Sequence, residues 1–68
     1  MIVKNFRRKD GEVVEIEFEN TGDIIDDMGD GHEISYIAVG SDFRGRVYWA
    51  TLTIIDNEIE EISEIEED

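Results

Sequence analysis

Carboxylates and the only histidine of the chain gather in residues 23–34, DIIDDMGDGHEI, the first stretch whose residue types could do chemistry. A calcium loop of the EF-hand type needs oxygen ligands at positions 1, 3 and 5, a glycine at 6 and a bidentate glutamate at 12. Counting from Asp26 puts Met28 at position 3 and Ile37 at position 12, so two ligand positions are apolar. Asp26 and Asp30 are therefore only weak metal candidates, and we predict an acidic loop leading into a strand.

Catalytic residue types are sparse in this chain. His32 has only Asp30 and Glu33 as acidic neighbours in sequence, and the serines lie in no nucleophile-activating motif. The absence of cysteine excludes disulfides, thiolate zinc sites and cysteine nucleophiles. A pair of carboxylates for acid–base catalysis has no distinguishing mark among nineteen acids. We therefore predict a protein that is not an enzyme and carries no cofactor.

The strongest global feature is the negative charge. Nineteen acids against six bases give −13 on 68 residues, whereas about 2–8 charges suffice to keep a small domain soluble. The acids form two blocks, residues 12–33 and 56–68, separated by a nearly neutral apolar segment. Such a chain repels nucleic acid and anionic membranes and attracts basic surfaces. We expect a basic protein partner and no direct contact with nucleic acid.

The chain is expected to form one domain over residues 1–68 in the cytoplasm. No apolar run approaches the ~20 residues of a membrane span. The segment MIVKNFRRKD also lacks the charged-then-apolar order of a signal peptide. There is no proline, internal repeat or linker-like stretch that would divide the chain.

The first two predicted strands form a hairpin. Residues 12–19, EVVEIEFE, alternate between apolar and acidic side chains, which is typical of a half-buried strand. A three-residue loop ending in Gly11 would set Phe6 of the preceding strand opposite Val14 and put the apolar residues on one face, with Lys4 opposite Ile16 as the exception. Glycine takes the left-handed conformation that such a loop requires at no steric cost.

The rest of the chain predicts three more strands and one helical turn. Ile24, Ile25 and Met28 have helical spacing and predict a helical turn near residues 22–28, with the isoleucines packed on the sheet. Residues 33–40 and 46–55 have two apolar faces, as central strands do. Within the second run Tyr48 and Trp49 face opposite sides, so at least one belongs to the core.

The C-terminal segment is the least regular. Asp56 and Asn57 offer a tight turn, and the isoleucines that follow recur every third residue, which fits neither strand nor helix. We predict a fifth strand over residues 58–63 and a frayed acidic end over 64–68. The predicted fold is mainly β, with five short antiparallel strands in a small barrel or rolled sheet. The alternative is an α+β roll with a C-terminal helix.

Function is predicted from the acids themselves. Glu15, Glu17 and Glu19 would stand roughly 7 Å apart on one strand face, similar to successive phosphates on a nucleic acid strand. The basic cluster at residues 7–9 is expected to pair with acids such as Glu12. The predicted binding residues share an acidic side chain in one of the two blocks. They are Glu15, Glu17, Glu19, Asp23, Asp26, Asp27, Asp30, Glu58, Glu60, Glu61 and Glu64.

The leading hypothesis is a non-enzymatic acidic binding protein, in its narrowest form a nucleic-acid-mimicking inhibitor of a basic nucleic-acid-handling protein. In size and charge the chain resembles small acidic inhibitors made by phages and other mobile elements, although no motif is shared. One alternative is a structural or subunit-interface module that forms a homo-oligomer through the apolar strand 46–55. The other is a weak binder of divalent cations.

Overall fold

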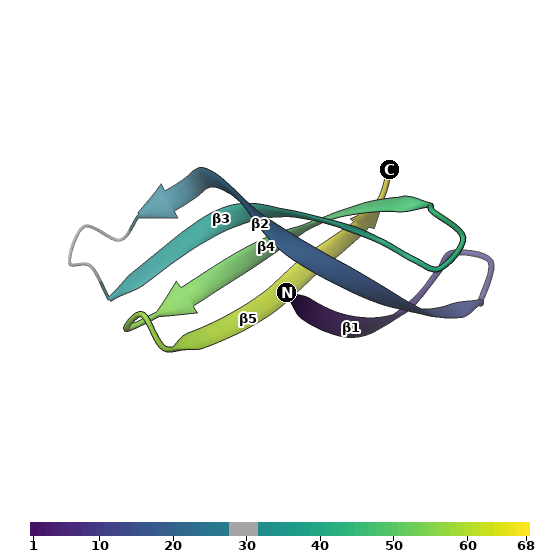
Figure 1. The fold of residues 1–68 in the computed structure, drawn as a ribbon, viewed down its shortest axis with the longest axis horizontal. Helices are drawn as coiled ribbons and strands as arrows, with labels where there is room; N and C mark the ends of the chain where they lie inside the picture. The colour runs from purple at the N-terminus through teal and green to yellow at the C-terminus, as the bar shows by residue number, and fades with distance from the viewer. Residues whose placement is uncertain (28–31) are drawn as a thin grey trace.

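The computed structural model describes residues 1–27 and 32–68 and contains one five-stranded antiparallel sheet (Figure 1). The strands are β1 (Ile2–Arg7), β2 (Val13–Asp27), β3 (Glu33–Ser41), β4 (Val47–Ile55) and β5 (Ile59–Glu67). Each strand pairs with the next one along the chain, and the molecule measures 40 × 18 × 17 Å. The mainly β prediction and the five strands are confirmed. The sheet is not closed into a barrel.

The described residues form no helix, so none of them belongs to a helix that could cross a membrane. The alternative fold with a C-terminal helix is therefore wrong, because residues 59–67 form β5.

The β1–β2 hairpin has the predicted register. Phe6 lies opposite Val14, and Ile2 lies opposite Phe18. The Arg8 amide donates to the Glu12 carbonyl at 2.7 Å, and Gly11 has a positive φ of 92°. The three-residue loop is confirmed, and its glycine takes the left-handed conformation.

The β3–β4 hairpin ends in a loop of the same construction. The Asp42 amide donates to the Arg46 carbonyl at 3.1 Å, and the Gly45 amide donates to the Asp42 carbonyl at 3.0 Å. Gly45 has a positive φ of 80°. Both loops lie at the same end of the sheet, on the right in Figure 1. Because both loops lie at this end, the residues that flank them come close together.

The core lies on one face of the sheet, here called the inner face. Alternate residues of β2 and β4 point into it, and β3 contributes the buried Ala38 and the partly buried Tyr36. The buried apolar residues are Val14, Ile16, Phe18, Ala38, Tyr48, Ala50 and Leu52. Tyr48 is fully buried, whereas its neighbour Trp49 is 41% exposed on the opposite, outer face. The predicted division of these two aromatics between the faces is confirmed.

The predicted helical turn near residues 22–28 is not formed. Residues 22–27 continue β2, which pairs with β3 as far as Asp27 opposite Ile34. Two register shifts, between Asn20 and Ile24 and between Ile24 and Asp26, interrupt the alternation. Because β3 pairs with β2 along this length, the backbone N–H and C=O groups of residues 22–27 find partners in the sheet and no helix is needed. The departure from two-residue alternation comes from the bulges.

The two isoleucines of this segment are also placed differently from the prediction. Ile24 is 57% exposed and Ile25 is 53% exposed, so neither is packed into the core. Met28, the third residue of the predicted turn, lies outside the described residues.

A bulge explains the three-residue spacing of isoleucines in β5. Glu64 has a positive φ of 53°, and the β4–β5 register shifts between Trp49 and Thr51. Because one extra residue is inserted there, Ile62 and Ile65 both pack toward the core although they are three positions apart. β5 also extends beyond the predicted segment 58–63, and the Asp68 amide donates to the Val47 carbonyl at 3.0 Å.

Gly40→Ala is expected to destabilise the fold by about 1–3 kcal/mol, the usual cost of overpacking. A Cβ at Gly40 would lie 2.6 Å from the Glu17 carbonyl oxygen and 2.7 Å from Cδ1 of Phe18. Urea denaturation followed by fluorescence would measure the loss. Ser41→Ala, at the exposed neighbouring position, is the control and should leave the midpoint nearly unchanged. Equal midpoints for the two variants would contradict this packing.

Candidate functional site

The two loops at one end of the sheet are joined by a polar cluster around Asp42. The side chain of Asp42 is fully buried. Its Oδ2 accepts from Arg46 Nε at 2.7 Å and from the Tyr48 hydroxyl at 2.8 Å. Its Oδ1 accepts from the backbone amides of Arg44 at 2.9 Å and Arg46 at 3.0 Å. Four donors therefore hold this carboxylate in place.

The same contacts decide the ionisation of Asp42. Burial acts to raise the pKa of Asp42, but the hydrogen bonds from Tyr48, Arg46 and the loop amides outweigh it and hold the pKa well below its usual range. The hydrogen bond to Asp42 raises the pKa of Arg46 in turn. Burial and the bond donated to Asp42 raise the pKa of Tyr48. At neutral pH Asp42 and Arg46 therefore remain charged, and the Tyr48 hydroxyl remains protonated.

Arg8 extends the cluster to the other hairpin and to the end of β5. Its Nη1 donates to the Tyr48 hydroxyl oxygen at 2.5 Å, and its Nη2 lies 2.9 Å from Oε1 of Glu67. Glu12 joins the two loops, because its Oε1 lies 3.1 Å from Arg46 Nη2 and 4.0 Å from Arg8 Nε. The predicted pairing of the basic hairpin with Glu12 is confirmed for Arg8. The end cluster consists of Arg8, Glu12, Asp42, Arg46, Tyr48 and Glu67.

The outer face of the sheet has a different character. Residues in register across it run from acid to apolar to acid: Glu19 lies opposite Val39, Val39 opposite Trp49, and Trp49 opposite Glu66. The centre of the face is an apolar stripe on β3 and β4, bordered by glutamates of β2 and β5. The outer face is defined by Glu15, Glu17, Glu19, Ile37, Val39, Val47, Trp49, Glu61, Glu64 and Glu66.

The predicted binding residues divide among several places. Five of them, Glu15, Glu17, Glu19, Glu61 and Glu64, are exposed and belong to the outer face. The other predicted binding residues that the structure describes are also exposed but do not belong to the outer face. Asp23, Asp26 and Asp27 lie along the far end of β2, Glu58 is the last residue of the β4–β5 turn, and Glu60 lies opposite Ile54 on the inner side. Asp30 lies outside the described residues.

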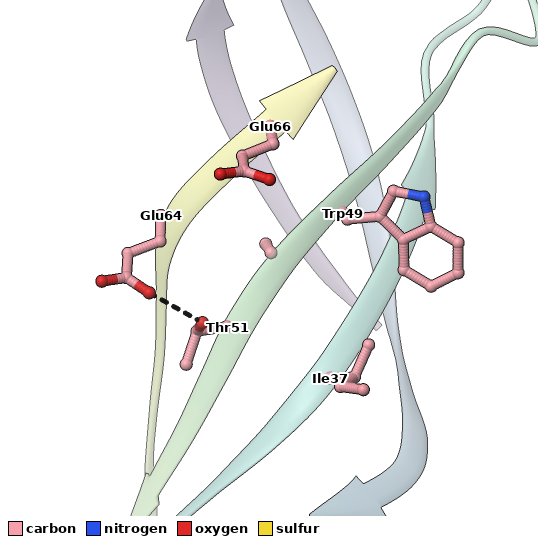
Figure 2. Close-up of a pocket in the computed structure, with 6 residues that line it drawn as sticks. Ile37, Trp49, Thr51, Glu64 and Glu66 are labelled. Carbon is pink, nitrogen blue, oxygen red and sulfur yellow. Dashed lines mark hydrogen bonds between the residues drawn. The ribbon is translucent and has the colours of Figure 1, made fainter. Parts of the chain in front are cut away.

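Trp49 and Glu66, which lie opposite each other on the outer face, are not among the predicted binding residues. The Trp49 indole Nε1 donates to Oδ1 of Asp68 at 3.1 Å. A shallow hollow of about 220 Å³ lies beside Trp49, with Glu64 and Glu66 of β5 on the other side (Figure 2). Thr51 donates to Glu64 Oε2 at 3.2 Å across this hollow. Two-residue alternation predicts that Tyr48 and Trp49 point to opposite faces of the strand, but it does not predict which of the two faces is exposed to solvent.

The candidate metal ligands are not gathered into a site in the part of the chain that the structure describes. No group of three or more acidic or histidine side chains among these residues is arranged to hold a metal ion. His32 instead lies 2.7 Å from Asp56 through Nδ1 and Oδ1, and both side chains are exposed. This contact links the loop before β3 to the β4–β5 turn.

Comparison with known proteins gives no relative: no protein-family model, curated protein or solved structure matches this chain.

Asp42→Asn is expected to lose stability at neutral pH and to approach the wild type as the pH falls. The folded-state pKa of Asp42 is depressed, so the unfolded chain, with a carboxyl pKa of about 3.9, takes up this proton first. The stabilisation from Asp42 is therefore complete above pH 4 or so and is lost progressively below it. Urea midpoints between neutral and strongly acidic pH would measure the difference.

Asp23→Asn, an exposed change of equal charge, serves as the control and should track the wild type at every pH. A gap between the wild type and Asp42→Asn that stays constant into the acid range would contradict the ionised, buried carboxylate.

Proposed function

We propose that this chain is a non-enzymatic binding protein whose outer face engages a basic surface of another protein. The proposal is supported by one observation: six exposed glutamates lie on the same sheet face as the half-exposed Trp49. Within the described residues, Glu15, Glu17 and Glu19 form no ion pair with any lysine or arginine. Glu61, Glu64 and Glu66 also form none.

The charge of the outer face favours a cationic partner. Alternate glutamates on β2 are roughly 7 Å apart, within the Debye length of about 8 Å at physiological ionic strength. They therefore repel one another through solvent, and a basic surface relieves this repulsion while the charges speed association. The arginines of the end cluster do not serve this purpose, since Arg8 and Arg46 pair with Glu67, Asp42 and Glu12.

Trp49 supplies the apolar and aromatic contact that a charged surface alone lacks. Its half-exposed ring adjoins the hollow bordered by Glu64 and Glu66. Arginine and lysine side chains bind tryptophan faces through cation–π contacts, and tryptophan is enriched among residues that dominate binding energy. The spacing of the β2 glutamates, close to that of phosphates, favours a nucleic-acid-binding cleft as the partner. The narrower proposal is therefore a nucleic-acid-mimicking inhibitor.

The two other candidate functions have less support. Strand β4 lies between β3 and β5, so both of its edges are already paired and it offers no edge to a second copy. The loop acids that suggested divalent cation binding show no arrangement for a metal within the described residues.

An octa-arginine peptide provides a direct probe of the outer face. We expect binding that weakens steeply with added salt, because long-range attraction is screened. Trp49→Ala and the triple variant Glu15→Gln, Glu17→Gln, Glu19→Gln should each weaken it by about tenfold or more. Fluorescence anisotropy of a labelled peptide measures both effects.

The control is a triple variant with the same change of charge away from the outer face: Asp23→Asn, Glu58→Gln, Glu60→Gln. It should weaken binding far less than the outer-face triple variant. Equal losses in the two triple variants would mean that net charge alone attracts the peptide, and the outer face would not be the site.

A further inference from the structure

The bulge in β5 determines which side chains lie beside Trp49. If the register at the start of β5 continued, Trp49 would lie opposite Ile65. The register shift inserts one residue, so Trp49 lies opposite Glu66 instead. The shift occurs at Glu64, whose φ of 53° lies in the left-handed region that residues other than glycine rarely adopt. The bulge therefore puts two carboxylates, in place of an isoleucine, on the β5 side of the hollow beside Trp49.

This hollow has an apolar side and an acidic side. Trp49 and Ile37 lie on one side of it, and Glu64 and Glu66 lie on the other (Figure 2). Its volume of about 220 Å³ gives room for one long side chain. The hollow is called the Trp49 hollow below, and its lining residues are Ile37, Trp49, Ala50, Thr51, Glu64 and Glu66.

Hydrogen bonds hold both sides of the Trp49 hollow in place. Trp49 Nε1 donates to Asp68 Oδ1 at 3.1 Å, and the Asp68 amide donates to the Val47 carbonyl at 3.0 Å. On the acidic side, the Thr51 hydroxyl donates to Glu64 Oε2 at 3.2 Å. A side chain that enters the hollow therefore meets groups whose freedom is already reduced, which lowers the entropic cost of binding.

The two carboxylates of the hollow are not neutralised by the chain itself. Within the described residues, neither Glu64 nor Glu66 forms an ion pair. Lys9 and Glu66 line a different hollow between β1 and β5, but Lys9 donates to Glu67 through its backbone amide. A cation placed between Glu64 and Glu66 would relieve the repulsion between their charges.

We propose that the Trp49 hollow binds one arginine side chain of the basic partner. The aliphatic part of this arginine lies against Trp49 and Ile37, and its guanidinium points toward β5 and donates to Glu64 and Glu66. Arginine is favoured over lysine because its planar group presents five N–H donors and can serve two carboxylates at once, whereas the lysine ammonium is compact and strongly hydrated. The inference rests on the proposed function for the basic character of the partner.

The test compares octa-arginine with octa-lysine, two peptides of equal charge, by fluorescence anisotropy. The unchanged protein should bind octa-arginine about fivefold or more tightly than octa-lysine. In the double variant Glu64→Gln, Glu66→Gln the two peptides should bind nearly equally, because neutral amides no longer attract the guanidinium. Glutamine keeps an oxygen that can accept from Thr51, so the hydrogen bond across the hollow is retained.

The matched control is the double variant Glu58→Gln, Glu60→Gln, which removes the same charge from exposed positions outside the Trp49 hollow. It should keep the preference for octa-arginine. A small probe, N-acetyl-arginine methylamide, tests the hollow by itself. It should shift the NMR signal of the indole N–H of Trp49, the only tryptophan of the chain, and the uncharged citrulline analogue should not.

Equal binding of the two peptides to the unchanged protein, or a preference that survives in the Glu64→Gln, Glu66→Gln variant, would overturn the arginine site. If the triple variant of Glu15, Glu17 and Glu19 still weakened both peptides, the proposed function would stand without this site. If neither peptide bound but the arginine probe shifted the Trp49 signal, the proposed function would fail and the arginine site would remain. If neither peptide bound and the probe left the signal unchanged, both would fail.

Discussion

The buried carboxylate of Asp42 accepts four hydrogen bonds at the end of the sheet where the two hairpin loops meet. The sheet is a single layer, and seven apolar side chains are buried among the described residues, which is a small core. At the end where the two similar loops meet, Asp42 accepts from Arg46 and Tyr48. Tyr48 in turn accepts from Arg8, which holds Glu67. One connected network thus joins both hairpins to the last strand.

The end cluster also determines where the charge of the protein remains uncompensated. Arg8 and Arg46 are committed to it, and Arg44 lies 3.8 Å from Glu12 at its margin. Arg7 of β1 lies on the outer face diagonal to Glu15, but the glutamates of this face form no ion pair with a lysine or arginine among the described residues. Sequence composition sets the net charge, but the position of the arginines at the loop ends determines that one sheet face is acidic. This separation allows the fold to be held at one end and a partner to be bound on another surface.

Much of the fold could be predicted from local patterns, because a two-residue alternation and the length of a loop together determine strand register. The opposition of Phe6 and Val14 follows from this arithmetic and is confirmed. The errors arise where bulges alter the alternation. Ile24 and Ile25 mimic helical spacing beside two register shifts, and the isoleucine spacing in β5 reflects the extra residue at Glu64.

The sites were harder to predict than the strands. Alternation correctly put Glu15, Glu17 and Glu19 on the solvent side of β2. The Arg8–Tyr48 contact joins residues forty positions apart, and no local pattern indicates such a pair. The exposure of Trp49 likewise depends on which face of β4 is covered. That depends on the sheet as a whole, which short sequence patterns do not describe.

The outer-face charge is tolerated by the fold and is not part of what stabilises it. The most direct measurement is the urea midpoint as a function of sodium chloride between about 0.02 and 0.5 M, since this range shortens the Debye length several-fold. We expect a midpoint that rises with salt, because screening relieves repulsion among exposed glutamates more than it weakens the buried end cluster. A midpoint that is indifferent to salt, or that falls, would mean that these charges already stabilise the fold through pairing.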